Sequence, residues 1–170
     1  MVGSYCEILN IWNFGFGIFE DGFLQFINPE EYNPLLKYCD IYLKPTIAFA
    51  ITAMGDLMVW EGSGNRTVAS DEGNRYALFL FRNQKKVIFS GRPTLLNILI
   101  GDREEIEDPD YFDAEIYYEA KAQKGPLSFG ECYGFEPLLV LGGSEKVSNI
   151  KIVKALEYLD IIGQTVGQID

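Results

Sequence analysis

Three short turns, each flanked by two strand-like runs of apolar residues, constrain the fold of this chain most. Runs joined by turns this short pair as antiparallel hairpins, and Gly supplies the positive φ that such a turn often needs. The sequence therefore predicts an antiparallel sheet built from hairpins. The turns are Asp21-Gly22, between residues 16–20 and 23–27; Met54-Gly55-Asp56, between 46–53 and 57–61; and Asn83-Gln84, between 76–82 and 85–90.

The first long strand, residues 46–53, alternates in side-chain type. Ile47, Phe49 and Ile51 fall on one face at the period of two that a strand imposes, and Ala48, Ala50 and Thr52 fall on the other. We expect at least one of these faces to be covered.

Helical patterns lie between and after the hairpins. Asn28 fits a helix N-cap, with Pro29 at the first helical position, and that helix is expected to run to about residue 39. Residues 93–100 and 108–124 predict two more helices, and Ser148 is expected to cap a last one. The expected inner stripe of the 108–124 helix is Tyr111, Ala114, Tyr118 and Ala122; that of the last helix is Ile150, Val153, Leu156, Leu159, Ile162 and Val166.

Residues 130–143 contain a four-residue apolar run, Leu138-Leu139-Val140-Leu141, between Pro137 and Gly142-Gly143. A short apolar run with these boundaries predicts a buried strand. Strands that come first and helices that mostly follow are typical of the α+β class. A chain of 170 residues is expected to form one globular domain of this kind, with the antiparallel sheet packed against several helices.

Composition limits the possible functions. The net charge of −11 disfavours nucleic acid and anionic membranes as partners and favours basic ones. The chain has no histidine, so the commonest general base and metal ligand are missing. We expect no enzymatic activity, although Glu, Asp, Lys or Tyr chemistry remains open. No apolar run reaches the length of a membrane helix and the N-terminus lacks a signal-peptide pattern, which predicts a cytoplasmic protein.

Several motifs suggest chemistry but fit structural roles better. Gly62-Ser63-Gly64 lacks the third glycine of a dinucleotide-binding loop, since Thr67 occupies that place, and so indicates a flexible loop. Cys132 has no histidine to activate it and is expected to be a buried thiol. The acidic stretch 102–113 lacks the ligand spacing of a calcium loop. We therefore expect neither a cofactor nor a metal.

The acidic stretch has two remaining interpretations, a solvated helix start and a partner-docking surface. The docking interpretation names residues from this stretch first and from the polar loop 62–73 second. The candidate partner-binding residues are Asp102, Glu104, Glu105, Glu107 and Asp108, together with Asp71 and Glu72.

Several segments together resemble a known family, the type VI secretion immunity proteins of the Tdi type. Residues 46–170 resemble its C-terminal domain, and residues 1–45 are similar to the GAD-related segment that precedes it. We expect the two parts to form one compact unit. The C-terminal motifs are Gly55-Asp56-Leu57-Met58-Val59-Trp60, Gly125-Pro126-Leu127, Glu131-Cys132-Tyr133-Gly134-Phe135 with Pro137, Leu141-Gly142-Gly143, and Val147-x-Asn149-x-Lys151. The N-terminal motifs are Gly15-Phe16-Gly17 and Asn28-Pro29-Glu30-Glu31-Tyr32.

The resemblance implies a non-enzymatic protein that binds and neutralises a toxin delivered by the secretion system, typically a DNase. A nuclease presents a basic surface to DNA, and an acidic protein complements such a surface. One alternative is a small-molecule or peptide-binding module whose pocket is lined by Trp12, Phe14 and Phe16. The other is an enzyme that uses two facing carboxylates.

Overall fold

The computed structural model describes residues 12–13, 15–19, 22–41, 45–62, 74–89, 112 and 114–170. The strands are β1 (Gly17–Phe19), β2 (Leu24–Phe26), β3 (Thr46–Thr52), β4 (Leu57–Gly62), β5 (Asn74–Leu80), β6 (Lys85–Phe89), β7 (Glu131–Phe135) and β8 (Ile150–Lys154). The α-helices are α2 (Pro29–Tyr32), α5 (Ala114–Lys124) and α6 (Ala155–Val166). The 3-10 helices are η2 (Asn33–Tyr38), η4 (Phe81–Asn83), η5 (Leu139–Leu141) and η6 (Val147–Asn149).

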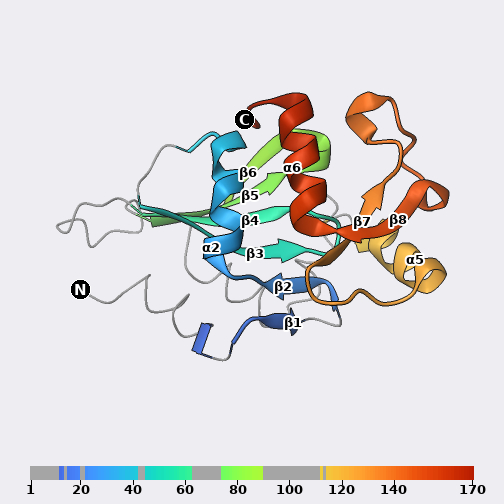
Figure 1. The fold of residues 1–170 in the computed structure, drawn as a ribbon, viewed down its shortest axis with the longest axis horizontal. Helices are drawn as coiled ribbons and strands as arrows, with labels where there is room; N and C mark the ends of the chain where they lie inside the picture. The colour runs from blue at the N-terminus through green and yellow to red at the C-terminus, as the bar shows by residue number, and fades with distance from the viewer. Residues whose placement is uncertain are drawn as a thin grey trace.

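The main sheet has six strands in the order β1-β2-β3-β4-β5-β6, and every neighbouring pair is antiparallel (Figure 1). All three predicted hairpins are present, and the α+β class is confirmed. The turns follow the local signals: Gly22 and Gly55 have φ of 97° and 79°, and Gln84 takes the left-handed conformation after η4. Sequence order and spatial order coincide across this sheet because each strand returns beside the one before it.

The predicted division of β3 into two faces is wrong at one end. The register shifts between Ala48 and Ala50, so Phe49 is an extra residue opposite β4. Such a bulge turns the following side chains over. Phe49 and Ala50 therefore pack in one hydrophobic cluster, while Ile51 packs in the cluster on the other side of the sheet.

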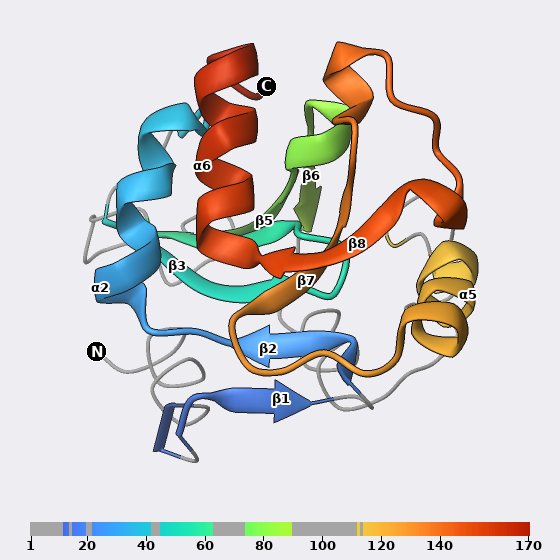
Figure 2. The ribbon, with the colours of Figure 1, turned by 45° about the vertical axis from the view of Figure 1, so that its right-hand side comes forward.

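One side of the sheet is covered by α2, η2 and α6, which lie side by side in both views (Figure 2). Helix α6 packs against η2: an ideal Cβ on Gly163 would lie 2.3 Å from the Tyr38 ring. The Tyr38 hydroxyl donates a hydrogen bond of 2.8 Å to Asp160 on α6. Glycine at position 163 thus allows the two helices to approach closely.

The predicted helix after Asn28 is confirmed only in part. The Asn28 side chain accepts a hydrogen bond of 3.1 Å from the Glu30 N–H, as an N-cap does. After Tyr32 the chain tightens from α into the 3-10 helix η2. The expected helix at residues 93–100 lies outside the described residues.

The strand predicted at Leu138-Leu139-Val140-Leu141 is also wrong. The strand in this region is β7, and the apolar run forms η5 instead, with Leu141 65% exposed. Two contacts fix β7 to the main sheet. The Tyr133 N–H donates to Ala53 O at 2.7 Å, and the buried Gln25 amide donates to Glu131 O at 2.7 Å. These partners are distant in the sequence. The local pattern of apolar residues therefore could not reveal them, and it predicted the strand too far toward the C-terminus.

The last predicted helix begins six or more residues later than expected. Residues Ile150–Lys154 form β8, which pairs antiparallel with β7, and α6 starts only at Ala155. Cys132, Tyr133 and Phe135 on β7 are fully buried, as predicted for Cys132. Among the helices of the described ranges, none combines the length and apolar character needed to cross a membrane.

Candidate binding surface

The acidic residues predicted to bind a partner are not within the described ranges. Asp71, Glu72, Asp102, Glu104, Glu105, Glu107 and Asp108 all fall in segments that the structure leaves undescribed. Their role stays a prediction. The first described helix after the acidic stretch is α5, which starts at Ala114.

Helix α5 exposes an aromatic side chain between two carboxylates. The buried residues of this helix are Ala114, Tyr117 and Ala120, so the predicted inner stripe through Tyr118 and Ala122 is wrong; Tyr111 is not described. Tyr118 is instead 41% exposed, and Glu115 and Glu119 are exposed beside it. The inner face is set by Phe23, whose ring lies 5.1 Å from that of Tyr117. The exposed side of α5 thus carries Tyr118 with acidic neighbours.

A pocket of about 360 Å³ lies between β1 and α5. Its walls include Ile18, Phe19, Tyr117, Lys121, Leu127 and Tyr133. Sequence reasoning missed it because its residues come from three separate parts of the chain. Trp12 and Phe16 do not line this pocket: Trp12 packs against the core and Phe16 is 49% exposed. Phe14, the third aromatic residue of the alternative hypothesis, is not described.

Two sets of buried charges are paired and belong to the fold. Asp56 and Arg82 lie 3.5 Å apart and both are almost fully buried. Glu61 is also buried, with Arg75 at 2.9 Å and Lys86 at 3.3 Å. Buried charges are tolerated when they are compensated in this way. The carboxylates of Asp56 and Glu61 face these cations inside the protein, so we assign both carboxylates to the stability of the fold.

The buried thiols are held in their protonated form. Burial raises the pKa of Cys39 to about 12, and burial is also the main cause of the raised pKa of Cys132. The thiolate is the reactive form of cysteine, so neither side chain is activated as a nucleophile at neutral pH. The prediction of a buried Cys132 is confirmed. No group of three or more metal-ligating side chains occurs in the part of the chain that the structure covers.

The hydroxyl groups of three tyrosines also have raised pKa values. Burial raises the pKa of Tyr32, Tyr133 and Tyr158 to about 12 in each case. Two of these hydroxyls have a structural partner: that of Tyr133 donates to Gly125 O, and that of Tyr158 accepts from the Phe135 N–H at 2.9 Å. They position backbone segments around β7.

A structural neighbour shows the same fold. The crystal structure of Atu4351 from Agrobacterium tumefaciens superposes with a TM-score of 0.64 and 21% sequence identity, covering 96% of this chain and 82% of that one. No curated protein matches the sequence. The α+β fold is therefore one that a solved structure already displays.

Two family models match separate parts of the chain. Residues 100–166 match the family described as T6SS immunity protein Tdi1, C-terminal, and residues 7–71 match the GAD-like domain. These two matches confirm the resemblance to type VI secretion immunity proteins of the Tdi type that the sequence shows. The C-terminal match includes α5, β7, β8 and all of α6.

Proposed function

We propose that this chain is a cytoplasmic immunity protein that binds a cognate type VI secretion toxin and neutralises it by stoichiometric blocking. The observation that carries the proposal is the match of residues 100–166 to an immunity-protein family. The buried, protonated thiols and the paired internal carboxylates agree with a protein that acts by binding and not by catalysis.

The toxin is proposed to be a nuclease with a basic surface. This chain has a net charge of −11, and the stretch 102–113 holds seven carboxylates against one arginine. A surface that binds DNA must be positively charged, and an acidic protein approaching it is steered by the long-range field. The proposed interface is centred on Asp102, Glu104, Glu105, Glu107 and Asp108, with Asp71 and Glu72 as a second contact.

Co-expression tests this function. Cells that express the cognate nuclease toxin are expected to survive when this chain is produced and to die when it is not. The two proteins are expected to co-purify. Continued toxicity, with no complex recovered, would rule out the proposal for that pair.

Charge reversal tests the proposed interface. The triple variant Glu104→Lys, Glu105→Lys, Glu107→Lys changes the net charge from −11 to −5, because three sites each gain two units. Its association rate with the inactivated toxin is expected to fall by roughly 10-fold or more at low salt, because steering is lost. Stopped-flow measurements at several salt concentrations report both the rate and its salt dependence.

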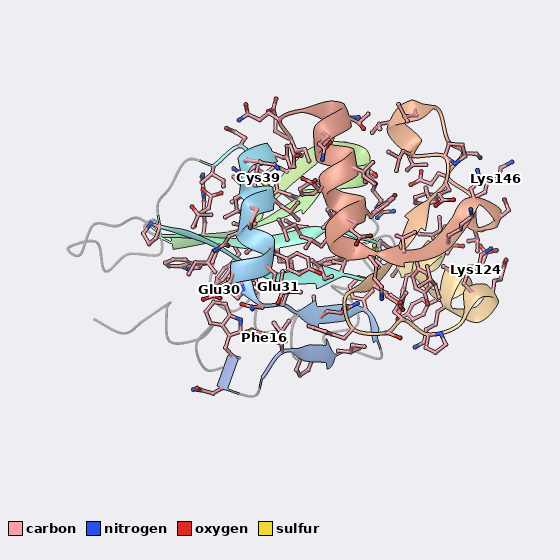
Figure 3. All side chains as sticks on the ribbon, viewed as in Figure 1. Phe16, Glu30, Glu31, Cys39, Lys124 and Lys146 are labelled. Carbon is pink, nitrogen blue, oxygen red and sulfur yellow. The ribbon has the colours of Figure 1, made fainter. Side chains whose placement is uncertain are left out.

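A control of equal charge change separates the local effect from the global one. The control is the triple variant Glu30→Lys, Glu31→Lys, Asp170→Lys. Figure 3 shows the two glutamates at the start of α2, and Asp170 is residue 170 of the chain. All three side chains are exposed. An equal loss of rate in this control would contradict an interface at residues 102–108, since net charge alone would then explain both results.

A small-molecule or peptide-binding module remains the second candidate. A pocket of about 460 Å³ beside η2, lined by Cys39, Asp40 and Thr46 among others, has the volume of a ligand site. This alternative is favoured over the first if a small compound raises the melting temperature in a concentration-dependent way while the toxin does not bind.

A further inference from the structure

The pocket between β1 and α5 has walls that are fixed before any partner arrives. Tyr117 is held between Phe23, at 5.1 Å between ring centroids, and Tyr133, at 6.2 Å. The Tyr133 hydroxyl is hydrogen-bonded to Gly125 O. Aromatic walls that are already ordered cost little conformational entropy when a ligand group enters. The pocket is therefore preformed.

The surroundings of the pocket continue its aromatic character onto the surface. Ile18, which lines the pocket, is 40% exposed. The ring of the exposed Tyr118 lies 5.1 Å from that of Tyr117 in the pocket wall. Exposed Tyr and apolar residues beside a pocket are typical of the energetic centre of a protein–protein interface.

Negative charge lies next to this aromatic surface. Glu115 and Glu119 occupy positions three residues before and one residue after Tyr118, on the exposed side of α5. Among the described residues of the wall, Lys121 is the one cation, and its ammonium lies 5.8 Å from the centre of the Tyr117 ring, over the face of that ring. A basic residue of a partner can pair with the two glutamates while an apolar neighbour enters the pocket.

We propose that this pocket receives one aromatic or large aliphatic side chain of the toxin, and that a Lys or Arg next to that side chain pairs with Glu115 or Glu119. The inference rests on the proposed function, because it takes the toxin as the partner. The occupant is a basic protein on grounds of charge: the acidic stretch 102–113 directly precedes α5 in the sequence, and the two glutamates extend the same charge onto the described surface. The apolar walls select the anchoring side chain.

A double variant tests the pocket. Tyr118→Ala with Ile18→Ala removes the two exposed apolar side chains while leaving Tyr117 and Tyr133 in place. Binding of the catalytically inactivated toxin, measured by titration calorimetry, is expected to weaken by about 10-fold or more, the change typical of losing an interface anchor. Ile161→Ala is the matched control, because Ile161 on α6 is 53% exposed and does not line the pocket. The control is expected to bind within about twofold of the wild type.

Each outcome has a distinct meaning. If the wild-type chain binds the toxin and the double variant binds it with the same affinity, the pocket proposal is overturned and the proposed function stands. Equal weakening in the Ile161→Ala control overturns it as well, since the effect is then not specific to the pocket. If the wild-type chain forms no complex, the proposed function fails and the pocket proposal fails with it. Melting temperatures of both variants show whether a loss of binding reflects unfolding.

Discussion

Replacing Arg82 by alanine is expected to lower the free energy of unfolding by about 3–5 kcal/mol, the cost of breaking a buried ion pair. Arg82 lies 3.5 Å from Asp56, and both are almost fully buried. Asp56 also accepts a hydrogen bond of 2.9 Å from the Thr52 hydroxyl, which fixes its carboxylate in the β3–β4 turn. Since Arg82 is in η4, the pair joins two hairpin ends of the main sheet.

Chemical denaturation of the variant measures this cost. Lys85→Ala is the matched control, because Lys85 is exposed and lies three residues further along the chain. It is expected to change stability by no more than about 0.5 kcal/mol. The double variant Asp56→Asn, Arg82→Met removes both charges and is expected to recover part of the loss, because neither member of this pair is then left as a buried charge without its partner. A loss below about 1 kcal/mol for Arg82→Ala would show that the pair contributes little to holding the hairpins together.

Gly143→Ala is expected to destabilise the chain by about 3 kcal/mol, at the upper end of overpacking effects. An ideal Cβ at this position would lie 2.0 Å from Pro137 O and 2.8 Å from Leu138 O. Both atoms are backbone, so they cannot move aside as a side chain does. The Gly143 N–H also donates to Leu138 O at 3.0 Å, which closes the turn through η5. The clash therefore opens a hydrogen-bonded loop.

The neighbouring glycine provides the comparison. Gly142 has a φ of 85° and open space where a Cβ would stand. Gly142→Ala thus carries only the cost of the left-handed backbone, about 1 kcal/mol. Urea unfolding of the two variants is expected to rank Gly143→Ala as clearly less stable. The reverse order would mean that the turn can shift to accept a Cβ at 143.

The hairpins were predictable because their signals are local. Gly22 and Gly55 lie at the turns where the sequence placed them, and the strands on both sides are short and apolar. The N-cap at Asn28 is local for the same reason. Secondary structure that is set by a few adjacent residues is visible without the rest of the chain.

The predictions that were wrong concern segments whose conformation depends on contacts with residues far away in the sequence. Ile150 and Val153 are three residues apart, which fits one face of a helix, but pairing with β7 makes this segment a strand, and the two side chains pack in different hydrophobic clusters. In α5, the stripes through Tyr117 and through Tyr118 are both possible from spacing, and the packing of Tyr117 against Phe23 selects the first. The pocket between β1 and α5 was invisible in the sequence because Ile18, Tyr117 and Tyr133 meet only in the folded chain.

The most direct test of the proposed immunity function is a calorimetric titration of the inactivated nuclease toxin with this chain, followed by a DNA-cleavage assay of the active toxin over the same range of ratios. Stoichiometric blocking predicts saturation at one chain per toxin, an affinity that falls as salt is raised, and cleavage that stops at that same ratio. A titration with no binding heat and undiminished cleavage would contradict the account. Cleavage abolished by a small fraction of an equivalent would contradict it too, because a catalyst would then be acting on the toxin.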